Sequence, residues 1–219
     1  MKTGIVLSGC GVMDGTEIHE AVLTMLHLDR AGSEAVCIAP DADQMHVVNH
    51  ISNEAIDGER RNMLLESARI ARGAVRDICT IQAGDIDALV FPGGFGAAKN
   101  LCTFAIHGKD CSVDRQVERL IMEMYEAGKP VGALCIAPVL VARVLGGNGH
   151  GVSVTIGNDK GVAEAIRAMG AVHVEAPVHE AVVDPACRVV TSPAYMLATG
   201  IKEVSESARA MVDGLVGLL

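Results

Sequence analysis

The chain has 219 residues, half of them hydrophobic, which is enough apolar material for one well-packed domain. It carries a net charge of −9, no tryptophan, two tyrosines and three phenylalanines, so its surface repels phosphates and offers few rings on which bases could stack. We therefore expect no nucleic acid partner, and because no apolar run approaches transmembrane length, we expect no membrane partner.

Short β-branched runs alternate with longer amphipathic stretches along the chain, a pattern that predicts βαβ units and a mostly parallel sheet. Residues 40–60 are polar and predict a long loop or a small insertion. A glycine-rich loop at 8–15 separates the first strand from the first helix. The first half of the chain is expected to contain strands at 4–7, 34–39 and 88–91, and helices at 16–31 and 62–72.

The second half of the chain continues the same alternation and adds a predicted β-hairpin near its end. Residues 97–112 are expected to be irregular. Two β-branched runs at 181–183 and 188–191, separated by Asp184-Pro-Ala-Cys187, predict a C-terminal β-hairpin. The remaining expected elements are helices at 113–127, 138–145 and 159–169, a strand at 152–156, and a final helix ending near Leu218. The whole chain, 1–219, is expected to form a single α/β domain.

A short apolar run ends on Cys135, and Pro138 follows at a position typical of a helix start. This pattern predicts a sharp strand-to-helix bend with the thiol at its apex, facing the free N–H groups of the helix. Such N–H groups can lower the pKa of a thiol and stabilise an oxyanion, so Cys135 is a candidate nucleophile. The alternative is a small buried hydrophobic residue, the commonest fate of a free cysteine.

Pro92-Gly93-Gly94-Phe95-Gly96 follows the predicted strand at 88–91, and parallel sheets build their sites at the carboxyl ends of strands. The glycines of this loop would let backbone N–H groups approach a ligand as an oxyanion hole. A tight turn without a ligand is the alternative. The earlier glycine loop lacks the third glycine of a dinucleotide-binding fingerprint.

Glu17 and Glu20 open the first predicted helix, where a spacing of three residues places both carboxylates near one face. Either one could act as an acid and base beside a thiol, because burial would raise its pKa. Either one could instead cap the helix. We expect one of the two to be functional.

None of the eight histidines is adjacent to Cys135, although His179 lies in a strand-like segment that could reach a pocket. His46 and His50 have i, i+4 spacing but lack a third ligand, so no metal site and no cofactor are predicted. Cys10, in the first glycine loop, is a candidate second thiol of the site. Seven cysteines without a C-x-x-C motif, and no signal-like start, predict a reducing cytoplasmic location.

Five segments in this order carry a family resemblance that runs essentially from end to end. Together they resemble the ElbB (enhancing lycopene biosynthesis) family of glyoxalase-like proteins. That family belongs to the PfpI-like superfamily, which has a class I glutamine amidotransferase-like fold. The segments are LSGCGVMDG (7–15), EIHE (17–20), PGGFGAAKN (92–100), CIAP (135–138) and SPAYML (192–197).

The resemblance implies a flavodoxin-like three-layer sandwich and a homodimer. It also implies Cys135 at the elbow, Glu20 beside it with Glu17 as second choice, and an oxyanion hole made by the N–H groups of Gly94 and Ile136. Protease-like members have a histidine after the cysteine, so Ile136 argues against peptide hydrolysis. Glutamine amidotransferases carry a His-x-Glu pair, whereas His179 and Glu180 are adjacent here, which disfavours glutaminase activity.

The resemblance thus implies a cofactor-independent glyoxalase acting on a small aldehyde substrate such as glyoxal or methylglyoxal. Two alternatives stay open. The first is a thiol-based sensor or regulatory protein of isoprenoid or stress metabolism, in which Cys135 is oxidised and the fold serves partner binding. The second is a small-molecule amidase, which would need a histidine within hydrogen-bond reach of Cys135.

Overall fold

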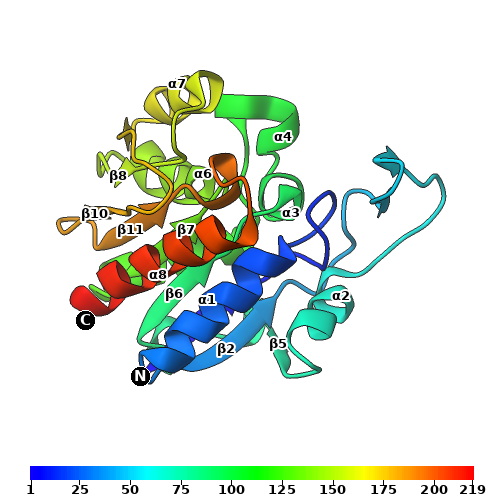
Figure 1. The fold of residues 1–219 in the computed structure, drawn as a ribbon, viewed down its shortest axis with the longest axis horizontal. Coiled ribbons are helices and arrows are strands. Elements are labelled where there is room, and N and C mark those ends of the chain that lie inside the picture. Colours follow the sequence, from blue (N-terminus) through cyan, green and yellow to red (C-terminus); the bar gives the residue numbers. More distant parts are fainter.

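Seven strands form the central sheet of the computed structural model, which describes residues 1–219 (Figure 1). Their order is β10-β11-β7-β6-β1-β2-β5, and every neighbouring pair is parallel except β10 with β11. The strands are β1 (Lys2–Val6), β2 (Glu34–Ala39), β5 (Val75–Asp77), β6 (Ala88–Phe91), β7 (Val131–Leu134), β10 (Val182–Asp184) and β11 (Val189–Ser192).

The central strands are covered on both faces. All four residues of β6 and all four of β7 are buried, as expected for parallel strands that read as continuous apolar runs. β1 pairs with β2 on one side and β6 on the other, so Ile5 lies opposite Cys37 and Val90. The carboxyl ends of β1, β6 and β7 therefore meet at one edge of the sheet.

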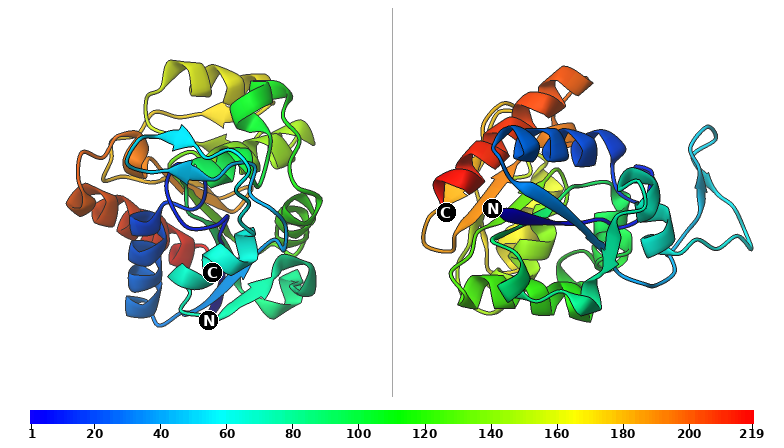
Figure 2. Two further views of the ribbon diagram at one scale, coloured as in Figure 1. Left: turned by 90° about the vertical axis from the view of Figure 1, so that its right-hand side faces the viewer. Right: turned by 90° about the horizontal axis from the view of Figure 1, so that it is seen from below.

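Helices cover the two faces of this sheet. α1 (Ile18–Arg30) and α8 (Ile201–Gly217) lie side by side on one face, where Leu28, Met211 and Leu215 pack against the strands (Figure 1). α5 (Arg115–Glu126) and α6 (Pro138–Val141) lie on the opposite face, and Figure 2 shows helices on both sides of the sheet. The predicted α/β three-layer sandwich with a mostly parallel sheet and a C-terminal β-hairpin is confirmed.

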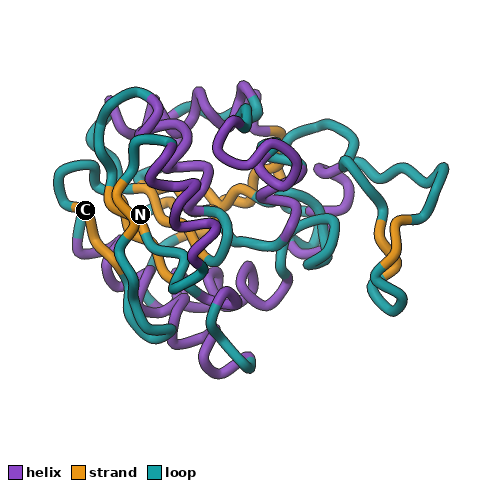
Figure 3. The backbone as a smooth tube through the Cα atoms, turned by 90° about the horizontal axis from the view of Figure 1, so that it is seen from above, coloured by secondary structure: helices purple, strands orange, loops and turns teal.

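Several local predictions need correction. Residues 40–60 contain a small antiparallel hairpin, β3 (Val48–Asn49) with β4 (Glu54–Ala55), which projects from the body as an arm (Figure 3). The segment 97–112 is not wholly irregular, because it includes the end of α3 (Phe95–Lys99) and α4 (Phe104–His107).

Other differences concern short elements. β8 (Ser153–Val154) covers only part of the strand predicted at 152–156, and it pairs with β9 (Val172–His173) outside the main sheet. The helix predicted at 138–145 continues beyond α6 as a π-helical turn, Ala142–Gly146. Strands of two or three residues, such as β5 and β9, are too short to produce a recognisable periodicity.

α2 (Met63–Ile70) and α7 (Lys160–Ala168) complete the helices and agree with the predicted positions. Both have side-chain caps, since Asn62 accepts from the N–H of Leu65 and Asp159 from that of Val162. None of the helices combines the length and apolar character needed to cross a membrane.

Candidate active site

Cys135 is the first residue after β7 and has φ of 59°, in the left-handed region that side-chain-bearing residues rarely adopt. Its N–H donates to the carbonyl of Ser192 at 3.0 Å, which ties the bend to the end of β11. α6 begins three residues later at Pro138. The predicted strand-to-helix elbow is therefore present, with its strained residue at the thiol.

Glu20, in the first turn of α1, is fully buried against this elbow. One carboxylate oxygen accepts the N–H of Gly93 at 2.8 Å and the other accepts the N–H of Tyr195 at 3.2 Å. The Cys135 thiol lies beside the same carboxylate, since a Cβ on Gly93 would be 2.7 Å from an oxygen of Glu20 and 3.0 Å from the sulfur. Three segments remote in sequence thus hold Glu20 in one orientation against the sulfur.

Burial raises the pKa of both groups, which makes Glu20 a better base near neutral pH and keeps the thiol of Cys135 protonated. It raises the pKa of Glu20 to about 7, with a further contribution from the charge of Glu17. Burial and then the charge of Glu20 raise the pKa of the Cys135 thiol well above its usual value, while the N–H groups of Gly94 and Ile136 act to lower it. The resting thiol is therefore protonated, with the Glu20 carboxylate beside it to accept the proton.

Glu17 has a different position from Glu20 although the two are only one turn apart. It is the N-cap residue of α1, and its carboxylate accepts the N–H of Glu20 at 2.7 Å. Its other oxygen lies 3.9 Å from Nδ1 of His19. Of the two candidate carboxylates, the structure brings Glu20 to the thiol and leaves Glu17 as the helix cap.

The glycines of the loop after β6 allow the close approach that this arrangement needs. Gly94 has φ of 92°, and a Cβ there would lie 2.4 Å from the nitrogen of Glu17. A Cβ on Gly93 would lie 2.5 Å from that of Cys135 and 2.7 Å from a carboxylate oxygen of Glu20. The loop can present N–H groups to the sulfur only because both positions lack side chains.

Two other predicted site residues lie elsewhere. Cys10 does not line the cavity at Cys135, and the charged groups nearest to its thiol include Glu66 and Arg69, at α2. His179 is in an exposed turn between β9 and β10, 3.8 Å from its neighbour Glu180. The structure does not bring either residue to the thiol.

Tyr195 and His19 were not among the predicted site residues. Tyr195 lines the cavity beside Cys135, and its hydroxyl is 2.8 Å from Nδ1 of His19. Tyr195 could have been predicted from its position, because it follows β11, the strand that pairs with β7. Functional sites of parallel sheets form at the carboxyl ends of strands. His19 lies in the first turn of α1 and does not itself line the cavity, but it reaches the site through its contact with the Tyr195 hydroxyl.

A cavity of about 490 Å³ opens at Cys135. It is lined mainly by apolar residues from separate segments of the fold, among which Tyr195 carries a hydroxyl group. None of the residues that line it is charged. The lining residues are Val12, Gly94, Phe95, Ala98, Phe104, Ala105, Cys135, Ile136, Val162, Tyr195 and Met196.

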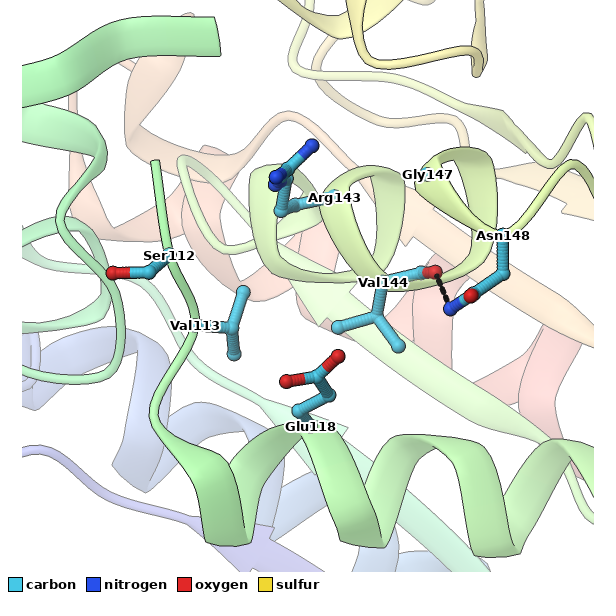
Figure 4. A pocket seen from close by; sticks show the side chains of 7 residues that line it. All are labelled: Ser112, Val113, Glu118, Arg143, Val144, Gly147 and Asn148. Carbon is cyan, nitrogen blue, oxygen red and sulfur yellow. Dashed lines mark hydrogen bonds between the residues drawn. The ribbon is translucent and has the colours of Figure 1, made fainter. Parts of the chain in front are cut away.

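A second hollow, of about 260 Å³, lies between α5 and the π-helical turn (Figure 4). Arg143 and Glu118 face it, but the Nε of Arg143 already donates to the carbonyl of Cys111 at 2.7 Å. Its lining offers no thiol and no paired carboxylates, so it lacks the chemistry assembled at Cys135. Nowhere in the chain are three or more His, Cys, Asp or Glu residues grouped to hold a metal ion.

Comparison with known proteins gives relatives that match nearly the whole chain. The human "Glutamine amidotransferase-like class 1 domain-containing protein 3, mitochondrial" is 50% identical over 226 residues, covering 99% of this chain and 83% of that protein. The "ES1 protein homolog, mitochondrial" of Rattus norvegicus is 48% identical, covering 99% and 84%.

A solved structure agrees in fold throughout. The "isoprenoid biosynthesis protein with amidotransferase-like domain" of Ehrlichia chaffeensis is 40% identical and superposes with a TM-score of 0.92, covering 100% of both chains. Agreement at this level over the full length of both chains shows that the two proteins share one overall fold.

The prediction of a cytoplasmic location is wrong by this comparison. The human, rat and Danio rerio relatives are all named as mitochondrial proteins. Free cysteines without a disulfide framework indicate a reducing environment and do not distinguish one reducing compartment from another.

A family model described as DJ-1/PfpI matches residues 10–201, which include the first glycine loop, Glu20, the Gly93–Gly94 loop and the Cys135 elbow. The name of the human relative includes a glutamine amidotransferase-like class 1 domain, which agrees with the superfamily that the sequence motifs resemble. The match spans far more than half of the chain, and the chain belongs to the DJ-1/PfpI family.

Proposed function

We propose that this protein converts 2-oxoaldehydes to 2-hydroxy acids without a cofactor, as a member of the glyoxalase-like ElbB branch of its family. The observation that carries the proposal is the contact between the protonated Cys135 thiol and the buried Glu20 carboxylate. A thiol supplies a nucleophile, and a carboxylate with a pKa of about 7 can both accept and return a proton near neutral pH.

In the proposed first step, the sulfur of Cys135 attacks the aldehyde carbon. Glu20 accepts the thiol proton as the carbon–sulfur bond forms, and the former carbonyl oxygen becomes an oxyanion. The N–H groups of Gly94 and Ile136, which already face the sulfur, would stabilise that charge. Return of the proton from Glu20 to this oxygen gives the hemithioacetal.

In the proposed second step, Glu20 removes the proton on the former aldehyde carbon while the neighbouring carbonyl oxygen takes up a proton, which gives an enediol. Glu20 then delivers the abstracted proton to the neighbouring carbon as the hydroxyl on the first carbon loses its own proton. The first carbon becomes a thioester carbonyl and the second an alcohol carbon, so one is oxidised as the other is reduced. Water then cleaves the thioester, releasing the 2-hydroxy acid and restoring the thiol. The overall change is addition of one water, and no external oxidant or reductant is required.

The structure favours this proposal over the alternatives. A redox sensor needs an accessible thiolate, whereas Cys135 is 8% exposed and the pKa of its thiol is raised. An amidase of the cysteine type needs an imidazole at the sulfur, but the groups that act on the Cys135 thiol are Glu20, Gly94 and Ile136, and no histidine lines its cavity.

The Ehrlichia chaffeensis structure is named for isoprenoid biosynthesis. A prenyl diphosphate would require cationic side chains or metal ligands around its phosphates. The cavity at Cys135 has no charged residue in its lining, so we propose aldehyde chemistry rather than diphosphate chemistry for this site.

The test is direct measurement of glycolate and lactate formed from glyoxal and methylglyoxal without glutathione. We expect saturable turnover by the wild type and background levels for Cys135→Ser. Glu20→Gln should lose about 10²- to 10⁴-fold in kcat, the usual contribution of general acid–base catalysis. Cys79→Ser removes an exposed thiol remote from the cavity and is the matched control. Equal acid formation by wild type and Cys135→Ser would refute the proposal.

A further inference from the structure

The cavity at Cys135 is much larger than the smallest 2-oxoaldehyde requires. Its volume of about 490 Å³ falls within the range of roughly 300–1,000 Å³ typical of pockets for drug-sized ligands. Glyoxal has only four non-hydrogen atoms, and the bond-making atoms of any 2-oxoaldehyde would occupy only the end near the sulfur. Most of the space lies beyond the reacting carbons and would receive the substituent on the ketone carbon.

The walls of that space come from segments that the fold brings together over the elbow. Val12 belongs to the first glycine loop, and Phe95 begins α3. Phe104 begins α4, and Val162 lies in the first turn of α7. Because separate elements contribute apolar side chains at the same place, the apolar lining is a feature of the tertiary structure and not of a single hydrophobic segment.

The rings and aliphatic side chains of this wall are only partly covered. Phe95 is 46% exposed, and Phe104 and Val162 are intermediate in exposure. Apolar side chains that stay partly exposed beside polar reacting groups indicate a substrate with an apolar part. On binding, that part would cover these side chains and remove them from water. An uncharged hydrocarbon substituent would cover the apolar side chains, whereas glyoxal would leave them exposed to solvent.

The charges around the cavity exclude a substrate with an ionised substituent. Lys99 is the cation next to the wall, but its ammonium lies 5.1 Å from the centroid of the Phe95 ring and donates to the carbonyl of Met13 at 3.2 Å. A phosphate or carboxylate inside the cavity would therefore be buried without a partner. The negative charges of Glu17 and Glu20, which act on Tyr195, would repel it further.

The Tyr195 hydroxyl is the polar side-chain group of the lining that could orient the substrate. It is held 2.8 Å from Nδ1 of His19, and its backbone N–H is bound to Glu20. The polar end of the cavity, formed by the sulfur, Tyr195 and the N–H groups of Gly94 and Ile136, thus faces the apolar end. This polarity matches a molecule with two adjacent carbonyls at one end and a hydrocarbon group at the other.

We propose that the substrates of this site are 2-oxoaldehydes that carry an uncharged, bulky apolar substituent, branched aliphatic or aromatic, seated against Val12, Phe95, Phe104 and Val162. The proposal rests on the proposed glyoxalase function and specifies its substrate class. Glyoxal and methylglyoxal are then poor substrates, because neither reaches the apolar wall.

The experiment compares kcat/KM of the full-length wild type for glyoxal, methylglyoxal, phenylglyoxal and 4-carboxyphenylglyoxal, with each 2-hydroxy acid measured directly. We expect phenylglyoxal to exceed glyoxal by at least about 10-fold, the discrimination available from small differences in apolar contact. The added carboxylate should reduce kcat/KM by at least about 10-fold, because its burial has no compensating partner. Equal or better use of glyoxal would overturn the proposed substrate class and leave the glyoxalase function intact.

A matched pair of variants locates the effect in the wall. Val162→Asp places a carboxylate in the cavity on a partly exposed helix turn and should reduce the phenylglyoxal-to-glyoxal ratio of kcat/KM by at least about 10-fold. Val172→Asp makes the same change on β9, where the valine is 50% exposed and lies outside the lining, and should leave the ratio unchanged. An unchanged ratio in Val162→Asp would overturn the assignment of the wall.

Binding without turnover separates this inference from the glyoxalase proposal. 2-Hydroxyacetophenone has the aromatic ketone but no aldehyde, and its binding to Cys135→Ser can be measured by titration calorimetry. Binding that Val162→Asp weakens, with no turnover of any aldehyde by the wild type, would support the apolar site and refute the glyoxalase function. Absence of binding together with absent phenylglyoxal turnover would refute the substrate class.

Discussion

The thiol of Cys135 lies beside the carboxylate of Glu20, and both side chains are buried. The contact joins the end of a central strand to the first turn of α1, more than a hundred residues away in sequence. Burial and then the charge of Glu20 raise the pKa of the thiol, so the properties of the sulfur depend on the carboxylate beside it.

The activity should depend on the ionisation of Glu20. The proposed first step needs its carboxylate to accept the thiol proton, and burial raises its pKa to about 7. We therefore expect kcat/KM to rise with pH and to level off above about 7. The measurement is a pH–rate profile between pH 5 and pH 9 with a substrate that does not titrate. An acid limb near 4.5, the ordinary value for glutamate, would contradict the assigned environment.

The same group should make the folded protein less stable as the pH rises. Its pKa is about 7 when folded and near 4.5 when unfolded, so the folded state binds the proton more tightly. The stabilisation is present below about 4.5 and is lost as the pH rises through about 7. At about 1.4 kcal/mol per pKa unit, the loss between pH 5 and pH 8 is on the order of 2 kcal/mol.

Urea unfolding of the wild type and Glu20→Gln at both pH values measures this loss. In Glu20→Gln the amide side chain would face two N–H donors, so this variant is less stable than the wild type at every pH. The relevant quantity is therefore how the difference in unfolding free energy between the two proteins changes with pH. The wild type should lose stability relative to Glu20→Gln on going from pH 5 to pH 8. Parallel pH dependence in the two proteins would show that Glu20 titrates as an exposed carboxyl does.

Glu17 should affect Glu20 through its charge and α1 through its cap. Glu17→Gln keeps a side-chain oxygen for the N–H of Glu20 but removes the negative charge that raises the pKa of Glu20. We expect the acid limb of the pH–rate profile to move to lower pH with little change in stability. Glu17→Ala should show the same shift and also lose about 1 kcal/mol of unfolding free energy, since the cap is gone. Abolished turnover in Glu17→Gln at pH 8 would instead indicate a direct catalytic role.

Gly93→Ala should disrupt the pair without adding a polar group. Its Cβ would lie 2.5 Å from that of Cys135 and 2.7 Å from an oxygen of Glu20, so the carboxylate or the elbow must move. We expect a loss of at least about 10²-fold in kcat, as for other small misplacements of catalytic groups. Gly84→Ala is the control, because nothing lies within 4 Å of the added carbon there. Near-normal activity of Gly93→Ala would mean that the contact is not required.

Some features of the fold were readable locally. β6 and β7 were predicted because parallel strands buried on both faces need unbroken apolar runs, and these are visible in any short window. The elbow was predicted because a proline at the start of a helix follows closely on one of these runs. The arm and β9 were missed because two-residue strands exist only through their pairing partners.

The site could be predicted only in part from the sequence, because the direction in which a side chain points depends on tertiary packing. The spacing of Glu17 and Glu20 placed both at the start of α1, but it contains no information on which one turns toward the sheet. That choice depends on the docking of α1 against α8 and the strands, which directs Glu20 to Gly93 and leaves Glu17 at the N-cap position of α1.

The sequence by itself determined the periodicity of the strands and helices, the elbow at Cys135 and the set of residues at the strand ends, because these are properties of short stretches of chain. Only the tertiary structure decided that Tyr195 and His19 join the site while Cys10 and His179 do not. It also decided that the thiol opens into an apolar cavity, since that wall is assembled from residues that meet only when distant elements pack together.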